Sequence, residues 1–175
     1  MIRTIRIAGF GGQGVMLLGQ ILAYCATLKD YNSVWVPTYG PETRGGTANC
    51  MVTLGDETIY SPVFTMCDDL IVFNAPSYQK FKQTLKPEGS LFYNASLIGE
   101  VDGDFQQLIG VPVNELATTL NNSKVINIIM LGRYLKHLGL FDEQDVLQAL
   151  THFFGEEKGH LIDINLEALK LGKNL

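Results

Sequence analysis

The sequence predicts an α/β domain with a mixed, largely parallel sheet, and three observations support this fold class. Short apolar runs alternate with segments of helical spacing along the chain. A glycine-rich turn, Gly9–Gly14, separates the first apolar run from the first helical segment. Leu70–Phe73 is a continuous apolar run, which is typical of a strand covered on both faces. Because 175 residues is the length of one domain, we assign residues 1–175 to a single domain.

The apolar runs are short, as expected of strands. We predict strands, in chain order, at residues 2–8, 34–36, 48–54, 58–60, 70–73 and 91–93. Pro37 should end the second strand, because proline lacks the N–H that a sheet needs. Gly55-Asp56-Glu57 should join the third and fourth strands as a hairpin, which would supply the antiparallel part of the sheet. Pro87-Glu88-Gly89 should break the chain before the last strand.

Helical spacing predicts a first helix after the glycine-rich turn and a second helix that Pro76 opens. The C-terminal half predicts further helices at residues 114–120, 127–138 and 143–154. Gly139 suits the residue after a helix end, and Asp142 suits the next N-cap. His137, near a helix end, should make a favourable contact with the helix dipole. The segments without a helical or strand pattern are residues 99–110 and 155–161, and the second predicts a mobile loop.

Composition excludes several classes of function. Thirteen Lys and Arg against 18 Asp and Glu give a net charge of −5 without a basic cluster, so we expect no nucleic-acid partner. Cys25, Cys50 and Cys67 are far apart and no C-x-x-C occurs, so we expect buried thiols and no metal or cluster on this chain. No apolar run is long enough to span a bilayer, and glycines interrupt the N-terminal apolar residues. We therefore expect a cytoplasmic protein without membrane contact.

The turn Gly9–Gly14 satisfies G-x-G-x-x-G between a strand and a helix, where such glycines let the backbone approach an anion. A dinucleotide site also needs an acid at the end of the second strand, but that strand ends Val36-Pro37-Thr38. A self-sufficient NAD- or flavin-binding oxidoreductase is therefore only an alternative. A second alternative is that the glycines merely allow close packing. We expect the amide of Gln13 to be exposed and to bond a group outside the domain.

The segment Tyr39–Gly46 follows the second strand, so it should lie at the same carboxyl edge of the sheet as the first turn. The planar guanidinium of Arg44 suits a phosphate or a carboxylate. The alternative is a surface turn with a solvated ion pair between Glu42 and Arg44. No histidine or nucleophile lies nearby in sequence, so we assign no catalytic residue to this chain. The candidate binding residues are Gly11, Gly12, Gln13, Gly14, Tyr39, Gly40, Pro41, Glu42, Arg44, Gly45 and Gly46.

Together the two loops resemble the gamma-type subunit of 2-oxoacid:ferredoxin (acceptor) oxidoreductases. The matching motifs are Gly9-Phe10-Gly11-Gly12-Gln13-Gly14-Val15 and Pro37-x-Tyr39-Gly40-Pro41-Glu42-x-Arg44-Gly45-Gly46. The similarity covers essentially the whole chain and continues at Asn127-x-x-Met130-Leu131-Gly132 and at Asn165-Leu166-Glu167-Ala168-Leu169-x-x-Gly172. Within the family, the version of the first loop with Phe10 looks most like the 2-oxoglutarate enzymes.

This resemblance implies a Rossmann-like three-layer domain in a heteromeric enzyme. Such an enzyme converts a 2-oxoacid, here 2-oxoglutarate, and coenzyme A to an acyl-CoA (succinyl-CoA) and CO2. Thiamine diphosphate and iron–sulfur clusters would be held by other subunits, and a ferredoxin-type acceptor would take the electrons. The two loops would dock against the thiamine-binding subunits and line the coenzyme A side of their cavity, or, in a pure scaffold, touch only protein. The isolated chain should be inactive and form a homodimer through exposed apolar surface.

Overall fold

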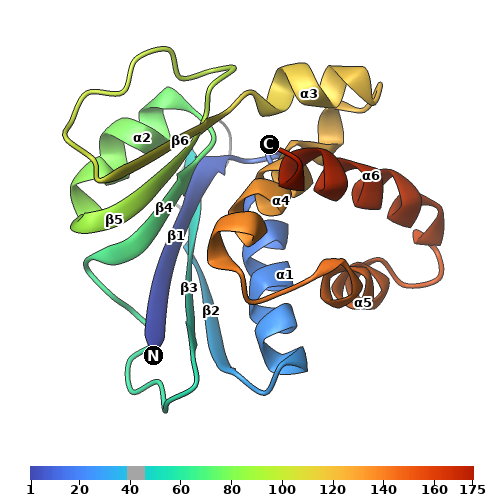
Figure 1. Ribbon diagram of the computed structural model, residues 1–175, viewed down its shortest axis with the longest axis horizontal. Coiled ribbons are helices and arrows are strands. Elements are labelled where there is room, and N and C mark those ends of the chain that lie inside the picture. The colour runs from blue at the N-terminus through green and yellow to red at the C-terminus, as the bar shows by residue number, and fades with distance from the viewer. Residues whose placement is uncertain (39–45) are drawn as a thin grey trace.

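The computed structural model describes residues 1–38 and 46–175. Its strands are β1 (Ile2–Phe10), β2 (Asn32–Thr38), β3 (Thr47–Gly55), β4 (Cys67–Val72), β5 (Leu85–Asn94) and β6 (Gln107–Val111). Its α-helices are α1 (Val15–Leu28), α2 (Ala75–Phe81), α3 (Val113–Thr119), α4 (Ile126–Leu138), α5 (Glu143–Phe154) and α6 (Ile162–Lys173). Strands and helices alternate along most of the chain, and the last elements are helices (Figure 1). This order confirms the predicted α/β class.

The sheet has the strand order β2-β3-β1-β4-β5-β6. The strands β1, β4, β5 and β6 are parallel, whereas β3 is antiparallel to both of its neighbours, β1 and β2. It follows that β2 runs in the same direction as β1. This arrangement confirms the predicted mixed, largely parallel sheet. It also brings the segments that follow β1, β2 and β4 to one edge.

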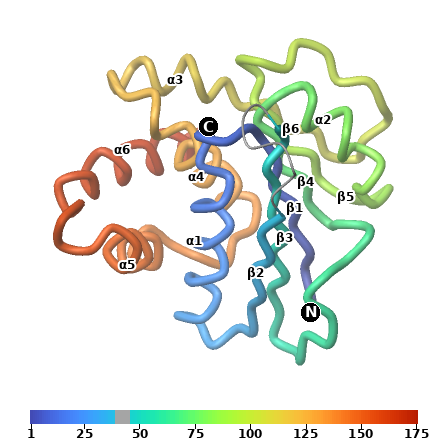
Figure 2. The backbone as a smooth tube through the Cα atoms, turned by 180° about the vertical axis from the view of Figure 1, so that it is seen from behind, coloured from blue at the N-terminus to red at the C-terminus, as the bar shows by residue number. Residues whose placement is uncertain are grey.

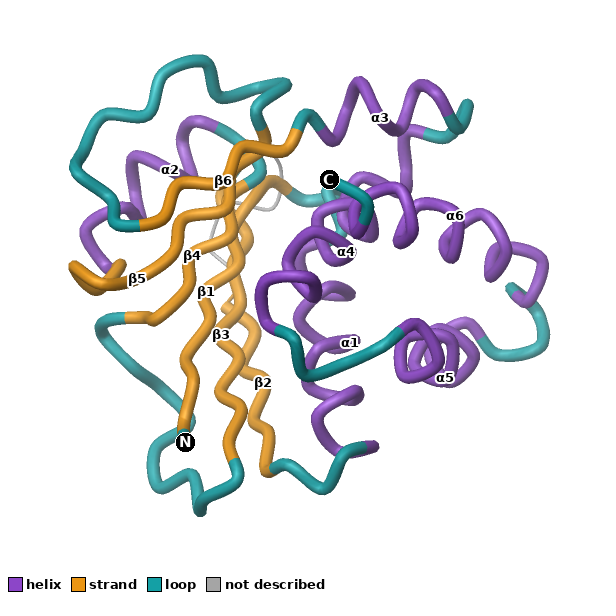
Figure 3. Tube along the Cα trace, viewed as in Figure 1, coloured by secondary structure: helices purple, strands orange, loops and turns teal. Residues whose placement is uncertain are grey.

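Helices cover both faces of the sheet (Figures 1 and 2). The short helix α2 lies on one face, and α1, α4, α5 and α6 lie on the side of the opposite face. Side chains of β1 alternate between these layers: Ile5 and Ile7 pack in the core with α1 and α4, whereas Ala8 packs in the core with Tyr78 of α2. This alternation is expected of a strand covered on both faces. Figure 3 shows the thicker helical layer beside the sheet. The expected three-layer arrangement is therefore confirmed.

The predicted hairpin within residues 48–60 is wrong. Residues 48–54 belong to β3, but residues 58–60 form no strand. Instead, β3 pairs along its full length with β1 and from Asn49 to Gly55 with β2. Its end is fixed by the N-terminus, since the N–H of Asp56 donates to the carbonyl oxygen of Met1 at 3.3 Å. Two long partner strands satisfy more backbone groups than a short local strand can, so the tertiary pairing prevails.

Neither proline segment ends a strand where the sequence predicts it. Pro37 lies inside β2, which is an edge strand, and an edge strand tolerates a missing N–H that faces away from the sheet. The segment Pro87–Gly89 lies inside β5. The register between β4 and β5 shifts after Cys67, and such an irregularity accommodates residues that a regular ladder would not.

Two elements are missing from the sequence prediction. Most of β6 falls in residues 99–110, and its Leu108 is 47% exposed, so no apolar alternation marks the strand. Helix α6 packs closely on α4, where a Cβ on Gly132 would collide with the backbone of α6 and a Cβ on Gly172 with the backbone of α4. Glycines permit this approach of two helix backbones. The buried stripe of α6, formed by Asn165, Ala168, Leu169 and Gly172, contains one large apolar side chain, so its apolar periodicity is weak.

The predicted helix boundaries are otherwise confirmed. Gly139 ends α4 in the left-handed conformation, with φ at 68°. The carboxylate of Asp142 accepts hydrogen bonds from the N–H groups of Gln144 (2.9 Å) and Asp145 (3.1 Å) and so caps α5. Asn74 caps α2 through the N–H of Ser77 at 2.9 Å. Helix ends can be predicted from the local sequence because a cap residue bonds backbone groups within one turn of its own helix.

Candidate binding site at the carboxyl edge of the sheet

The first candidate loop lies where β1 ends and α1 begins, at the carboxyl edge of the sheet. The end of β2 lies at the same edge, as predicted, because β2 is parallel to β1. Of the second candidate loop, Gly46 precedes β3 and is half-buried. The other predicted residues of that loop lie outside the described residues: Tyr39, Gly40, Pro41, Glu42, Arg44 and Gly45.

The four glycines of the first loop divide into two pairs. A Cβ on Gly9 would lie 2.8 Å from the Gln13 side chain, and one on Gly14 would collide with the Asn127 side chain. These two glycines allow close packing, as one of the alternatives holds. A Cβ on Gly11 or Gly12 would meet no atom of residues 1–38 and 46–175 within 4 Å, and both residues are exposed. Packing therefore explains the outer pair, and the positive φ of Gly12, 91°, favours glycine there. Gly11 and Gly12 both remain exposed, so they could face a ligand or partner.

The prediction that Gln13 bonds a group outside the domain is wrong. Its Oε1 accepts hydrogen bonds from the N–H of Phe10 (2.7 Å) and from Nδ2 of Asn74 (2.8 Å). Its Nε2 lies within 3.5 Å of the carbonyl oxygen of Phe73. Asn74 follows β4, which the sheet places beside β1. The sequence separates these residues widely, so only the strand order reveals the partners of Gln13.

An open pocket of about 390 Å³ lies beside the exposed glycines. Its lining consists of Phe10, Gly11, Gly12, Gly14, Val15, Met16, Leu17, Gln20 and Ala48. The N-terminus of α1 borders this pocket, has no side-chain cap and carries no acid in its first turn. Its partial positive charge therefore faces the opening without competition from a carboxylate of the same turn. The pocket combines an apolar wall with a positive rim.

The structure gives a geometric reason to disfavour a dinucleotide. In a dinucleotide fold, the acid that binds the ribose follows a strand beside β1. Here β3 lies between β1 and β2, so the end of β2 is two strands, or about 10 Å, from β1. The side chains of Gln13 and Asn74 also fill the crevice between the ends of β1 and β4.

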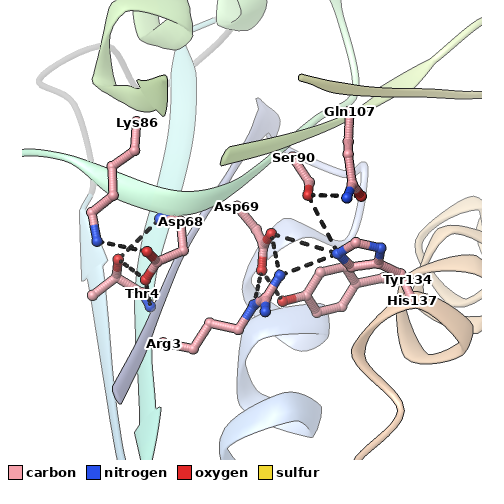
Figure 4. A network of polar contacts seen from close by, with 9 residues as sticks. All are labelled: Arg3, Thr4, Asp68, Asp69, Lys86, Ser90, Gln107, Tyr134 and His137. Atoms are coloured by element: carbon pink, nitrogen blue, oxygen red, sulfur yellow. Dashed lines mark hydrogen bonds and ion pairs between the residues drawn. The ribbon is translucent and has the colours of Figure 1, made fainter. Parts of the chain in front are cut away.

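A second polar cluster lies toward the opposite, amino-terminal ends of the strands (Figure 4). The fully buried carboxylate of Asp69 accepts hydrogen bonds from Nε (2.5 Å) and Nη2 (2.8 Å) of Arg3. It also accepts one from the hydroxyl of Tyr134 at 2.6 Å. Nε2 of His137 lies 3.1 Å from Nη2 of Arg3 and 3.3 Å from Oγ of Ser90. We call these five residues the amino-edge cluster.

The amino-edge cluster contains the residue types of a hydrolase triad, but its geometry differs from one. Asp69 and Ser90 both approach the same ring nitrogen of His137, Nε2, whereas a triad needs the carboxylate on Nδ1. Burial lowers the pKa of His137, so the neutral ring is favoured. His137 lies in the last turn of α4, where the sequence predicts its contact with the helix dipole, and that contact stays a prediction. The cluster joins α4 to β1 and β4.

Among the residues that the structure describes, no group of three or more His, Cys, Asp or Glu could hold a metal ion. The cysteines are buried free thiols, as predicted. Burial raises the pKa of Cys25 and Cys50 to about 12 and that of Cys67 to about 11. Over residues 1–38 and 46–175, no helix combines the length and apolar content that a bilayer crossing requires.

Comparison with known families assigns this fold. A model of pyruvate ferredoxin/flavodoxin oxidoreductase matches residues 4–175. The chain belongs to the pyruvate ferredoxin/flavodoxin oxidoreductase family. Within this family, the chain is 37% identical over 171 residues to ketoisovalerate oxidoreductase subunit VorA of Methanothermobacter thermautotrophicus, covering 96% of this chain and 35% of VorA. It is 31% identical over 157 residues to 2-oxoglutarate synthase subunit KorC of Methanocaldococcus jannaschii, covering 86% of this chain and 82% of KorC.

Two solved structures of the family have the same fold. The gamma subunit of a keto/oxoacid ferredoxin oxidoreductase from Geobacter sulfurreducens superposes with a TM-score of 0.83 at 26% identity, covering 98% of this chain and 96% of that chain. A 2-oxoglutarate:ferredoxin oxidoreductase from Magnetococcus marinus, with 2-oxoglutarate, coenzyme A and succinyl-CoA bound, superposes with a TM-score of 0.86 at 27% identity. That match covers 99% of this chain and 30% of the other. In this family, the fold thus occurs both as a separate chain and within longer chains.

Proposed function

We propose that this chain is the gamma-type subunit of a 2-oxoacid:ferredoxin oxidoreductase that converts 2-oxoglutarate and coenzyme A to succinyl-CoA and CO2. The observation that carries the proposal is the match in sequence and fold over nearly the whole chain to the M. marinus enzyme. The KorC relative, of comparable length, supports 2-oxoglutarate as the substrate. The VorA relative is more similar in sequence, but this chain spans about a third of its length.

On this chain, the pocket beside Gly11 and Gly12 is the part that suits coenzyme A. The positive end of α1 suits a phosphate group, and the apolar residues Val15 and Leu17 suit an uncharged chain. The exposed backbone of the two glycines lets a ligand or a partner approach closely. Thiamine diphosphate and iron–sulfur clusters, which supply decarboxylation and electron transfer, are assigned to partner subunits.

The test is activity of the chain purified with its native partner subunits. We expect reduction of a ferredoxin or viologen acceptor that depends on coenzyme A, with the highest kcat/KM for 2-oxoglutarate among 2-oxoglutarate, 2-ketoisovalerate and pyruvate. The isolated chain should turn over none of them. Turnover by the isolated chain with added NAD(H) or FAD would instead establish the self-sufficient oxidoreductase. A higher kcat/KM for 2-ketoisovalerate or pyruvate would overturn the proposed substrate.

Arg44 belongs to the same proposal, on the basis of its motif alone. A guanidinium that faces a phosphate contributes enough that Arg44→Ala should raise the KM for coenzyme A about tenfold, or weaken assembly. Lys124→Ala, which removes an exposed cation elsewhere, is the matched control. Unchanged kinetics together with intact assembly would remove Arg44 from the site. If coenzyme A protects no residue of either loop in the complex, the chain is a scaffold.

A further inference from the structure

The crevice between the ends of β1 and β4 is the place where doubly wound proteins usually bind a ligand. Here the chain leaves β1 toward α1 on one face and leaves β4 toward α2 on the other, so the two connections diverge (Figures 1 and 2). Amide side chains of the protein itself occupy this crevice, as shown by the contact between Gln13 and Asn74. They are therefore placed to set the shape of the turn that follows β1.

Gln13 and Asn74 hold the turn from the side of the sheet. Oε1 of Gln13 accepts from the N–H of Phe10 (2.7 Å) and from Nδ2 of Asn74 (2.8 Å), so one atom joins both ends of the turn to the N-cap of α2. Asn74 is 3% exposed, and its Oδ1 is engaged by the N–H of Ser77 (2.9 Å) at the start of α2. The turn is thus anchored to a buried helix cap.

Asn127 holds the turn from the side of the helical layer. Its Nδ2 donates to the carbonyl oxygen of Gly14 at 3.2 Å, and the side chain is 3% exposed. Gly14 has φ at 75°, and its missing side chain leaves the space that Asn127 fills. Asn127 belongs to α4, which is locked to α6 by the close contacts of Gly132 and Gly172. The second anchor is therefore also rigid.

We propose that Gln13 and Asn127 are positioning residues that hold the Gly11–Gly12 backbone in the shape that binds coenzyme A in the assembled enzyme. This inference rests on the proposed function and attributes the ordering of the glycine turn to the hydrogen bonds of Gln13 and Asn127. Between the two anchors lie Gly11 and Gly12, where an added Cβ would meet no atom of the part of the chain that the structure describes. A turn ordered before binding loses less conformational entropy when the ligand arrives.

The experiment uses the chain purified with its partner subunits. Gln13→Met keeps the size of the side chain and removes its hydrogen bonds. It should raise the KM for coenzyme A about tenfold, while kcat at saturating coenzyme A and the KM for 2-oxoglutarate change less than about twofold. Asn127→Ala should do the same. Gln83→Met, an exposed glutamine after α2, is the matched control and should leave all three constants unchanged.

A second variant separates positioning from folding. Asn74→Ser keeps an N-cap for α2 but loses the donor to Gln13, so it should raise the KM for coenzyme A, and the double variant with Gln13→Met should add no further increase. Wild-type enzyme without coenzyme A-dependent activity would refute the proposed function and not this inference. An active wild type, with an unchanged KM for coenzyme A in Gln13→Met, would overturn the inference. A fall in kcat together with similar rises in the KM for coenzyme A and the KM for 2-oxoglutarate would also overturn the inference, because such a pattern indicates general structural damage.

Discussion

The two ends of β1 carry polar clusters that satisfy their groups in different ways. At the amino-terminal end, the charges of Arg3 and Asp69 pair with each other, and Asp69 is fully buried (Figure 4). At the carboxyl end, neutral amides such as Gln13 bond the backbone of the turn and leave Gly11 and Gly12 exposed. The ion pair between Arg3 and Asp69 stabilises the fold. The hydrogen bonds of Gln13 instead order the turn while the backbone of Gly11 and Gly12 stays exposed. A reactive-looking set of residues is therefore a weaker sign of function than an ordered turn with open space.

The largest expected effect falls on the amino-edge cluster. Asp69→Ala leaves the guanidinium of Arg3 and the hydroxyl of Tyr134 without their shared partner. We expect a loss of about 3 kcal/mol in the free energy of unfolding, measured with urea, because breaking a buried pair leaves a charge uncompensated. Glu143→Ala removes a carboxylate that is 41% exposed and should cost less than about 1 kcal/mol. Equal losses would contradict the structural role of the cluster.

The next effect distinguishes the two pairs of glycines at the carboxyl end. Gly14→Ala introduces a Cβ at positive φ and against Asn127, and should destabilise the chain by about 2 kcal/mol or more. Gly11→Ala meets open space and should change the free energy of unfolding by less than about 0.5 kcal/mol. Thermal and urea unfolding of both variants test the comparison. If Gly11→Ala were the more destabilising, packing would not divide the glycines as described.

A bulky side chain at Gly11 tests the function of the turn separately from the stability of the fold. Gly11→Leu should leave the unfolding of the isolated chain nearly unchanged, because among the described residues no atom lies within 4 Å of a Cβ placed on Gly11. In the assembled enzyme, it should raise the KM for coenzyme A about tenfold or weaken subunit assembly, since a ligand or partner loses its close approach to the backbone. Normal assembly and normal kinetics in Gly11→Leu would mean that the exposed turn faces only solvent.

The smallest effect is a pH dependence at the amino-terminal end. Burial lowers the pKa of His137 below its ordinary value near 6.5, and the charged groups beside the ring are Asp69, Arg3 and Arg133. The unfolded chain therefore binds a proton more readily, so stability falls as the pH decreases from about 6.5 toward the folded pKa. Unfolding at pH 7.5 and 5.5 should show a smaller difference in His137→Gln than in the matched variant His160→Gln. Identical differences would contradict this assignment.

Local signals in the sequence predict local structure well. The N-cap Asp142, the helix start at Pro76 and the helix end at Gly139 depend on neighbours within one turn. The strand at Leu70–Phe73 follows from its apolar run. The pattern of β6 is weak because an edge strand is half exposed. The pattern of α6 is weak because its buried residues include one large apolar side chain, Leu169. These elements depend on neighbours that the local sequence does not contain.

The candidate site shows the same division. Its location, at the glycine turn after the first strand, follows from the motif and the parallel direction of β1 and β2. The role of Gln13 does not follow from the motif, because its partners Phe73 and Asn74 come from a distant segment. The anchor Asn127 was visible only as part of a family motif, and its contact with Gly14 needed the packing of α4.

By itself, the sequence determined the α/β class, the order of most elements, the family and the position of the glycine turn. The fold class, the order of elements and the turn follow from periodicity and spacing along the chain, and the family follows from the resemblance of its motifs. Only the tertiary structure decided that β3 lies between β1 and β2, that Gln13 bonds inward and that Gly11 and Gly12 remain open. These features depend on which distant strands and helices satisfy one another's backbone groups, and that choice is made by the whole fold.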